Sequence, residues 1–160
     1  MSDSSLLMLL EEVRGKTLKR LEGLTDVQAR WVPAGLHNSI LWHAGHAYVV
    51  VEALAARGLG VDPSIPAGWH VMFSWESRPA EVSPASWPTL AEVVAHLHEQ
   101  KDRLHAAIAA RSTTDLDHPC SARPDKSNRY EILHGLHDEA CHSGEIWLLR
   151  KLQQTATAQD

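Results

Sequence analysis

Two groups of histidines in this chain of 160 residues have a spacing suited to binding a metal ion. His43 and His46 are three residues apart, about 60° on a helical wheel, within a strongly apolar segment. A buried imidazole costs free energy unless it finds a polar partner. The pair is therefore explained either by histidines that hydrogen-bond inside the core or by a metal ligand on an apolar helix.

The second group contains His137, Asp138, Glu139 and His142. Asp138 and Glu139 precede His142 by four and three residues, which places either carboxylate on the same helical face as the imidazole. His137 lies about 140° from His142 on the wheel and cannot bind the same ion from a regular helix. We expect an ion site to use His142 with Asp138 or Glu139. The alternative is a solvated polar helix face.

One histidine from the first group and a carboxylate with a histidine from the second would make a set of three ligands. Imidazole and carboxylate together suit divalent transition metals. Three protein ligands leave coordination positions open, which is typical of catalytic sites. Such an ion could acidify a bound water or bind a substrate thiol as thiolate. A minor alternative is a nucleophilic pair formed by Cys141 and His137, four residues apart.

The elements that must position these residues are helical. Apolar residues recur at helical spacing in segments 4–21, 39–57, 89–111 and 128–152, and no segment shows a strand pattern. Residues 26–31 are expected to form one or two turns, and Thr89 with Glu92 predicts a capping box. The second segment is apolar almost all round, so we expect it to be deeply buried. These features predict one all-α domain over residues 1–160, a four-helix bundle.

Two connections and the end of the chain complete this expected organisation. Residues 61–88 contain five prolines, one glycine and three tryptophans but no helical period, and predict a long crossover between the second and third helices. That crossover could let the two helices run parallel. Residues 112–128 are expected to be a loop, and residues 153–160 a frayed tail.

Charge and cysteine content exclude several classes of protein. The formal net charge is -5 and there is no basic run, which argues against binding nucleic acid or an anionic membrane. Two cysteines without a CxxC motif do not make a disulfide framework. No apolar stretch is long enough to span a bilayer. We therefore expect a cytoplasmic protein.

Three stretches of the sequence resemble the DinB/YfiT-like superfamily in order and spacing. They are Asn-Ser-Ile-Leu-Trp-His-Ala-Gly-His at 38–46, Trp-Pro-Thr-Leu-Ala-Glu at 87–92, and His-Asp-Glu-Ala-Cys-His-Ser-Gly-Glu-Ile at 137–146. The resemblance implies an up-down-down-up four-helix bundle with a long crossover. It also implies one Zn or Ni ion held by His46, Asp138 and His142. Position 138 is commonly histidine in that family, so the aspartate is a departure that bears on metal affinity and metal choice.

The resemblance further implies a metal-dependent transferase that joins a low-molecular-weight thiol, similar to bacillithiol or mycothiol, to an electrophile. In this hypothesis Glu139 orients a ligand or acts as a base. Trp42, Trp69, His70 and Trp75 contact the substrate, although the tryptophans are also explained as packing anchors. The alternatives are a non-catalytic metal-binding protein of the stress response and a metal-dependent hydrolase. Helical bundles of this size often pair, so a homodimer is a further hypothesis.

Overall fold

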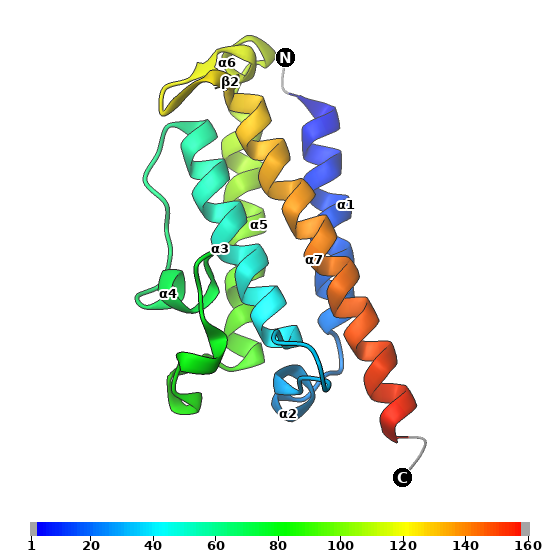
Figure 1. Ribbon diagram of the computed structural model, residues 1–160. Coiled ribbons are helices and arrows are strands. Elements are labelled where there is room, and N and C mark those ends of the chain that lie inside the picture. The colour runs from blue at the N-terminus through cyan, green and yellow to red at the C-terminus, as the bar shows by residue number, and fades with distance from the viewer. Residues whose placement is uncertain (1–2, 158–160) are drawn as a thin grey trace.

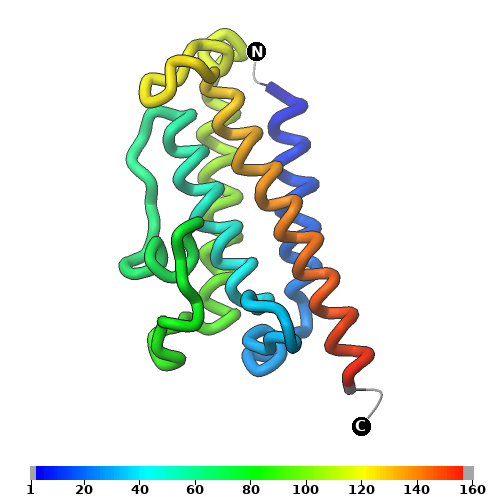
Figure 2. Tube along the Cα trace, viewed as in Figure 1, coloured from blue at the N-terminus to red at the C-terminus, as the bar shows by residue number. Residues whose placement is uncertain are grey.

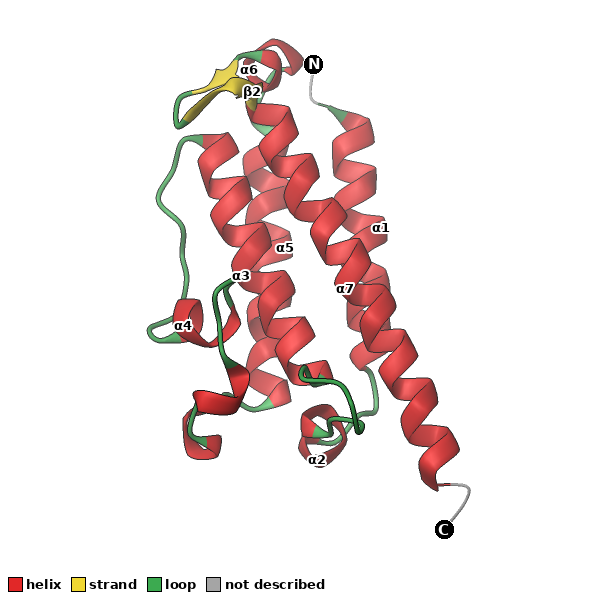
Figure 3. Ribbon diagram, viewed as in Figure 1, coloured by secondary structure: helices red, strands yellow, loops and turns green. Residues whose placement is uncertain are grey.

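The computed structural model describes residues 3–157 and is built mainly from helices (Figures 1 and 3). Its four long helices are α1 (Ser4–Leu21), α3 (Ile40–Leu59), α5 (Leu90–Ala109) and α7 (Asn128–Thr157). The shorter elements are α2 (Asp26–Arg30), α4 (Trp69–Phe73), η1 (Pro79–Glu81), η2 (Pro84–Ser86), α6 (Thr113–Asp117), β1 (Pro119–Cys120) and β2 (Arg123–Ser127). The prediction of a mostly helical chain is confirmed.

Side-chain caps explain where three of the four long helices, α1, α3 and α5, begin. The Asp3 carboxylate accepts from the Leu6 amide and Ser39 accepts from the Trp42 amide. Thr89 and Glu92 form the predicted capping box at the start of α5. Each cap satisfies an amide that has no partner within its own helix. The short helix α2 is also where the sequence predicts one or two turns.

The long helices lie side by side, and the contacts between them show which helices are neighbours. α3 contacts α5 and α7, and α1 contacts the same two helices. The tube in Figure 2 descends along α1 and α7 and ascends along α3 and α5. As predicted, α3 is buried almost all round. Its apolar surface is covered by α5, α7 and the short helix α4.

The connections are more structured than the sequence indicates. The crossover at 61–88 contains α4 and two 3-10 turns, and the expected loop at 112–128 contains α6 and a small antiparallel hairpin. The hairpin corrects the prediction that strands are absent. It is too short to show a strand pattern, and it buries Cys120 at one end of the bundle. Residues 153–157, predicted to be frayed, continue α7, whereas 158–160 lie outside the described residues.

A network of buried polar side chains joins all four long helices. Arg14 of α1 donates to both carboxylate oxygens of Glu139 on α7, at 2.7 and 2.9 Å, and to Gln100 of α5 at 2.6 Å. Gln100 donates in turn to Glu52 of α3, which also accepts from Arg103. The charges in the core are thus paired, as buried charges must be.

Within residues 3–157, no helix combines the length and the apolar character needed to cross a bilayer.

Candidate metal centre

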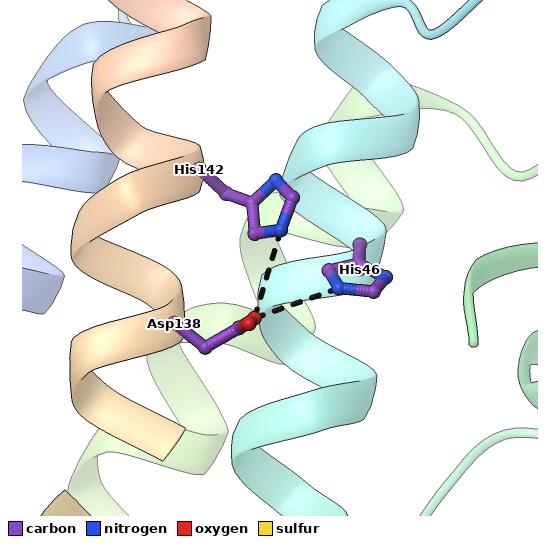
Figure 4. Close-up of side chains that lie close together, drawn as sticks. All are labelled: His46, Asp138 and His142. Atoms are coloured by element: carbon purple, nitrogen blue, oxygen red, sulfur yellow. Dashed lines mark ion pairs between the residues drawn. The ribbon is translucent and has the colours of Figure 1, made fainter. Parts of the chain in front are cut away.

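Three side chains from α3 and α7 converge between these two helices (Figure 4). The Oδ2 atom of Asp138 lies 3.5 Å from Nε2 of His46 and 3.7 Å from Nε2 of His142. One potential ligand atom from each residue lies within 4.8 Å of the other two. The structure therefore brings together the three residues that the resemblance implies as ligands, although His46 is far from the other two in the sequence.

The Asp138 carboxylate is suited to a cation. Its Oδ2 atom is buried and has no hydrogen-bond partner among the described residues. Burial raises the pKa of Asp138, but the contact with His46 and the positive charge that His142 and His46 can carry together bring it below its usual value. The group is therefore ionised at neutral pH. A buried, ionised oxygen beside two imidazole nitrogens is a donor set that fits a divalent transition metal.

His46 is held in position by the short helix α4. Its Nδ1 atom lies 2.6 Å from the carbonyl oxygen of Phe73. A carbonyl can only accept, so Nδ1 carries the proton and donates. The lone pair is then on Nε2, the atom that faces Asp138. Outer hydrogen bonds of this kind orient metal-binding histidines and fix their tautomer.

His142 has an equivalent partner in His43. The Nδ1 atoms of the two rings are 2.8 Å apart. Burial, and then the charges of His142 and His46, lower the pKa of His43 to about 3, so this ring is neutral. Burial also lowers the pKa of His142, with a further contribution from His46. When His142 donates from Nδ1 to His43, its Nε2 lone pair faces Asp138.

His43 has a supporting role that the sequence pattern did not predict. The available signal was the pair of histidines three residues apart on an apolar helix, which left open whether one or both served the site. The structure shows that they do different things. His46 faces Asp138, whereas His43 contacts His142 from the neighbouring turn.

Of the four residues expected to contact substrate, two lie beside the cluster. The Trp42 ring stacks on His46 with a centroid distance of 4.6 Å, and its Nε1 donates to the Met72 carbonyl and to Ser77. Trp75 lies edge-on to His46, with centroids 6.2 Å apart, and 55% of its surface is exposed. Both tryptophans therefore contact His46, but Trp42 is buried and only Trp75 is open to solvent.

The other two residues are placed differently. Trp69 is buried, with ring contacts to Tyr48, Phe73 and His96, so it anchors α4 in the core. His70 follows it on α4 and is exposed. The described contacts of these two residues include none with the three-residue cluster.

Glu139 is not beside the cluster either. It is fully buried, and both its oxygens accept from Arg14 on α1. Adjacent residues of a helix point about 100° apart, so Asp138 faces α3 while Glu139 faces α1. The expectation that Glu139 orients a ligand or acts as a base does not fit this placement.

The pair considered as a nucleophile lies outside the cluster. The Cys141 sulfur is 3.9 Å from Nε2 of His137, and both side chains are exposed on α7. They face solvent, away from α3.

Comparison with known proteins agrees with this architecture. No curated protein matches the sequence significantly. Among solved structures, the crystal structure of the conserved protein of locus from Enterococcus faecalis is similar, with a TM-score of 0.76 over 95% of this chain and 97% of that one. The two sequences are 16% identical, so the similarity shows a shared fold. The sequence also matches the DinB superfamily over residues 9–146, which include the three clustered residues. The chain therefore belongs to the DinB superfamily.

Proposed function

We propose that the protein binds one Zn or Ni ion through His46, Asp138 and His142 and uses it to transfer a low-molecular-weight thiol to an electrophile. The observation that carries the proposal is the buried Asp138 oxygen, which has no hydrogen-bond partner within residues 3–157 and lies between two imidazole Nε2 atoms. Paired nitrogen and carboxylate donors support a borderline transition metal over Mg²⁺ or Ca²⁺.

A bound ion would supply Lewis acidity, which lowers the pKa of a thiol so that it is present as thiolate at neutral pH. Three protein ligands leave room for that sulfur. In the transfer, the thiolate sulfur forms a bond to an electrophilic carbon. The leaving group departs with the electron pair of the broken bond, and the proton of the thiol goes to solvent.

The chain's own residues orient the reactants. The Phe73 carbonyl and His43 hold the two imidazoles in fixed tautomers. The exposed Trp75 offers an apolar surface for the electrophile beside His46, and the buried Trp42 packs against the His46 ring. Because low-molecular-weight thiols are kept reduced in the cytosol and both cysteines of the chain are free, we place this reaction in the cytoplasm.

We also propose the up-down-down-up order for the four long helices. The course of the chain in Figure 2 and the contacts of α3 and α1 with both α5 and α7 support it. In this order the crossover passes along the bundle and brings α4 to the ligand residues.

The test compares wild type with His142→Ala, purified without a His tag and reconstituted with Zn or Ni. Exposed His98→Ala on α5 is the matched control. Elemental analysis should find one ion per chain in wild type and the control, and none in His142→Ala. Loaded wild type should conjugate bacillithiol or mycothiol to an alkylating electrophile faster than metal-free protein. A chain that binds no metal after reconstitution, or a loaded chain no faster than the metal-free one, would overturn the proposal.

A further inference from the structure

Two arginines meet at a single buried carboxylate where α3 ends and α7 begins. Arg57 of α3 donates to one oxygen of Glu131 on α7 at 3.0 Å, and Arg123 of β2 lies 3.3 Å from the other oxygen. The Glu131 side chain is fully buried, whereas those of Arg57 and Arg123 are 33% and 39% exposed. We call Arg57 and Arg123 the arginine pair. It is held from the inside by one carboxylate and is reached by solvent from the outside.

The arginine pair carries more positive charge than its own contacts balance. Two guanidinium groups share one carboxylate, which leaves one positive charge in excess. Other acidic side chains at this end of the bundle are in ion pairs of their own: Asp125 with Lys126, and Asp3 and Asp117 with Arg129. Because like charges repel each other, two adjacent guanidinium groups favour a bound anion.

The donors of the arginine pair are largely free for a ligand. Within residues 3–157, Arg57 makes one side-chain hydrogen bond. The contact of Arg123 with Glu131 is an ion pair without a hydrogen bond, since that carboxylate oxygen has no hydrogen-bond partner in the same range. A guanidinium presents a planar fork of N–H groups that matches the two oxygens of a carboxylate. The chemistry of the pair is therefore that of a carboxylate- or phosphate-binding site.

The arginine pair and the candidate metal centre lie along the same side of the contact between α3 and α7. Glu131 precedes Asp138 by seven residues, so the two share a face of α7 and are about 10.5 Å apart along its axis. Arg57 follows His46 by eleven residues, which is a rotation of only about 20° on α3. A single molecule could therefore contact both places.

The opposite direction from the metal centre is unsuited to an anion. Glu145 follows Asp138 by seven residues on the same face of α7, and it is exposed. Its carboxylate repels a negative group. An anionic ligand with one end at the metal centre is thus favoured to extend towards the arginine pair.

We infer that the arginine pair binds a carboxylate of the thiol cosubstrate while the sulfur of that thiol lies at the candidate metal centre. The inference rests on the proposed thiol transfer and selects, among thiols, those that carry a carboxylate. An axial distance of about 10.5 Å corresponds to about three extended residues, so a thiol of tripeptide size has the required reach. A thiol without a carboxylate would bind only through its sulfur.

The experiment compares glutathione with its diethyl ester on protein loaded with cobalt, without oxygen. Cobalt serves as the probe because a thiolate bound to it gives a charge-transfer absorption band, which reports binding without turnover. Wild type should bind glutathione about tenfold more tightly than the ester, the effect expected for hydrogen bonds to a charged group. In Arg57→Met and in Arg123→Met the affinity for glutathione should fall to that for the ester, and the affinity for the ester should not change.

Arg103→Met is the matched control. Arg103 is also a half-exposed arginine that pairs with a fully buried glutamate of α3, but its partner is Glu52 and it lies on α5. This variant should keep the wild-type preference for glutathione. A purely structural role of the arginine pair would change the affinities for both thiols alike, or neither. Each single variant leaves Glu131 one arginine, and circular dichroism melting checks that it is folded.

The outcomes separate this inference from the proposed function. A band with both thiols but equal affinities in wild type, or a preference that persists in Arg123→Met, would overturn the inference alone. No band with either thiol would overturn the thiol chemistry itself and the inference with it. Isothermal titration with inorganic phosphate tests the other source of the same chemistry. Phosphate binding that Arg123→Met abolishes, without a preference for glutathione over the ester, would assign the pair to free anions and overturn the assignment to the thiol.

Discussion

Gly45 of α3 lies directly against the ring of Phe73 in α4, so close that a Cβ at position 45 would overlap the ring carbons. Phe73 is fully buried, and its ring contacts Trp69 and Trp87 at centroid distances of 5.3 and 5.2 Å. The ring therefore has little room to move. Because the Phe73 carbonyl holds His46, the absence of a side chain at Gly45 determines how closely α4 can approach the candidate metal centre.

Gly45→Ala is therefore expected to weaken metal binding without changing a ligand. The added methyl displaces Phe73 and lengthens the bond from His46 to its carbonyl. Loss of such an outer contact typically lowers metal affinity by about 10- to 100-fold. Competition with a chromophoric chelator measures the change for Zn or Ni.

Gly15→Ala is the matched control for that substitution. It also lies within a long helix, but a Cβ there would meet nothing within 4 Å. Its metal affinity should equal that of wild type, and its stability should rise by about 0.5–1 kcal/mol. Equal affinities for the two glycine variants would show that α4 does not position His46.

Asp138→Asn tests the carboxylate as a ligand. The amide has the same shape but carries no charge, so the loss in affinity should exceed the about 10- to 100-fold typical of an outer contact. Isothermal titration with Zn gives the affinity directly. Asp138→His, which restores a strong donor at the same place, should again bind one ion. If Asp138→Asn binds as tightly as wild type, the carboxylate does not touch the ion.

Glu139→Leu should destabilise the fold while leaving the metal centre intact. It removes the partner of Arg14 and leaves a guanidinium buried without its carboxylate, which costs about 3–5 kcal/mol. Urea unfolding measures this loss. The double variant Arg14→Met with Glu139→Leu should recover much of it. If the Glu139→Leu protein folds but no longer binds the ion, Glu139 would instead be part of the metal site.

The pKa of His43 predicts how the metal-free protein responds to acid. Burial lowers this pKa from 6.5 to about 3, so protonation of His43 favours the unfolded chain. Its contribution to stability is intact above pH 6.5 and is lost as the pH falls towards 3. Urea unfolding of chelator-treated protein should show a shallower loss over this interval in His43→Gln than in wild type. His98→Gln, at an exposed position, should follow wild type.

The sequence was most informative where a local pattern determines the structure. Three patterns depend only on residues that are close in the sequence, and all three appear in the fold. They are the helical spacing of leucines, the capping box of Thr89 and Glu92, and the apolar residues on nearly all sides of segment 40–59. The carboxylate at 138 and the imidazole at 142 share a face for the same reason.

What the sequence could not predict depends on distant contacts. Helical spacing alone left open whether Asp138 or Glu139 lies beside His142, and only the family resemblance implied Asp138. The physical reason is Arg14, which lies on another helix and binds the Glu139 carboxylate. Likewise, only the packing of α4 shows that Trp69 is an anchor while Trp75 lies beside His46. The hairpin at 119–127 is too short to have a period of its own.

Asp138 and Glu139 are adjacent in α7, but Asp138 faces α3 and Glu139 faces α1, so one helix joins the buried polar network to the candidate metal centre. Sliding α1 past α7 by one turn, about 5.4 Å, would separate Arg14 from Glu139 and leave both charges unpaired in the core. The same holds for α5 against α3 through Gln100 and Glu52. These contacts therefore fix how far each long helix is shifted along the bundle axis relative to the others. With this alignment Asp138 lies beside His46.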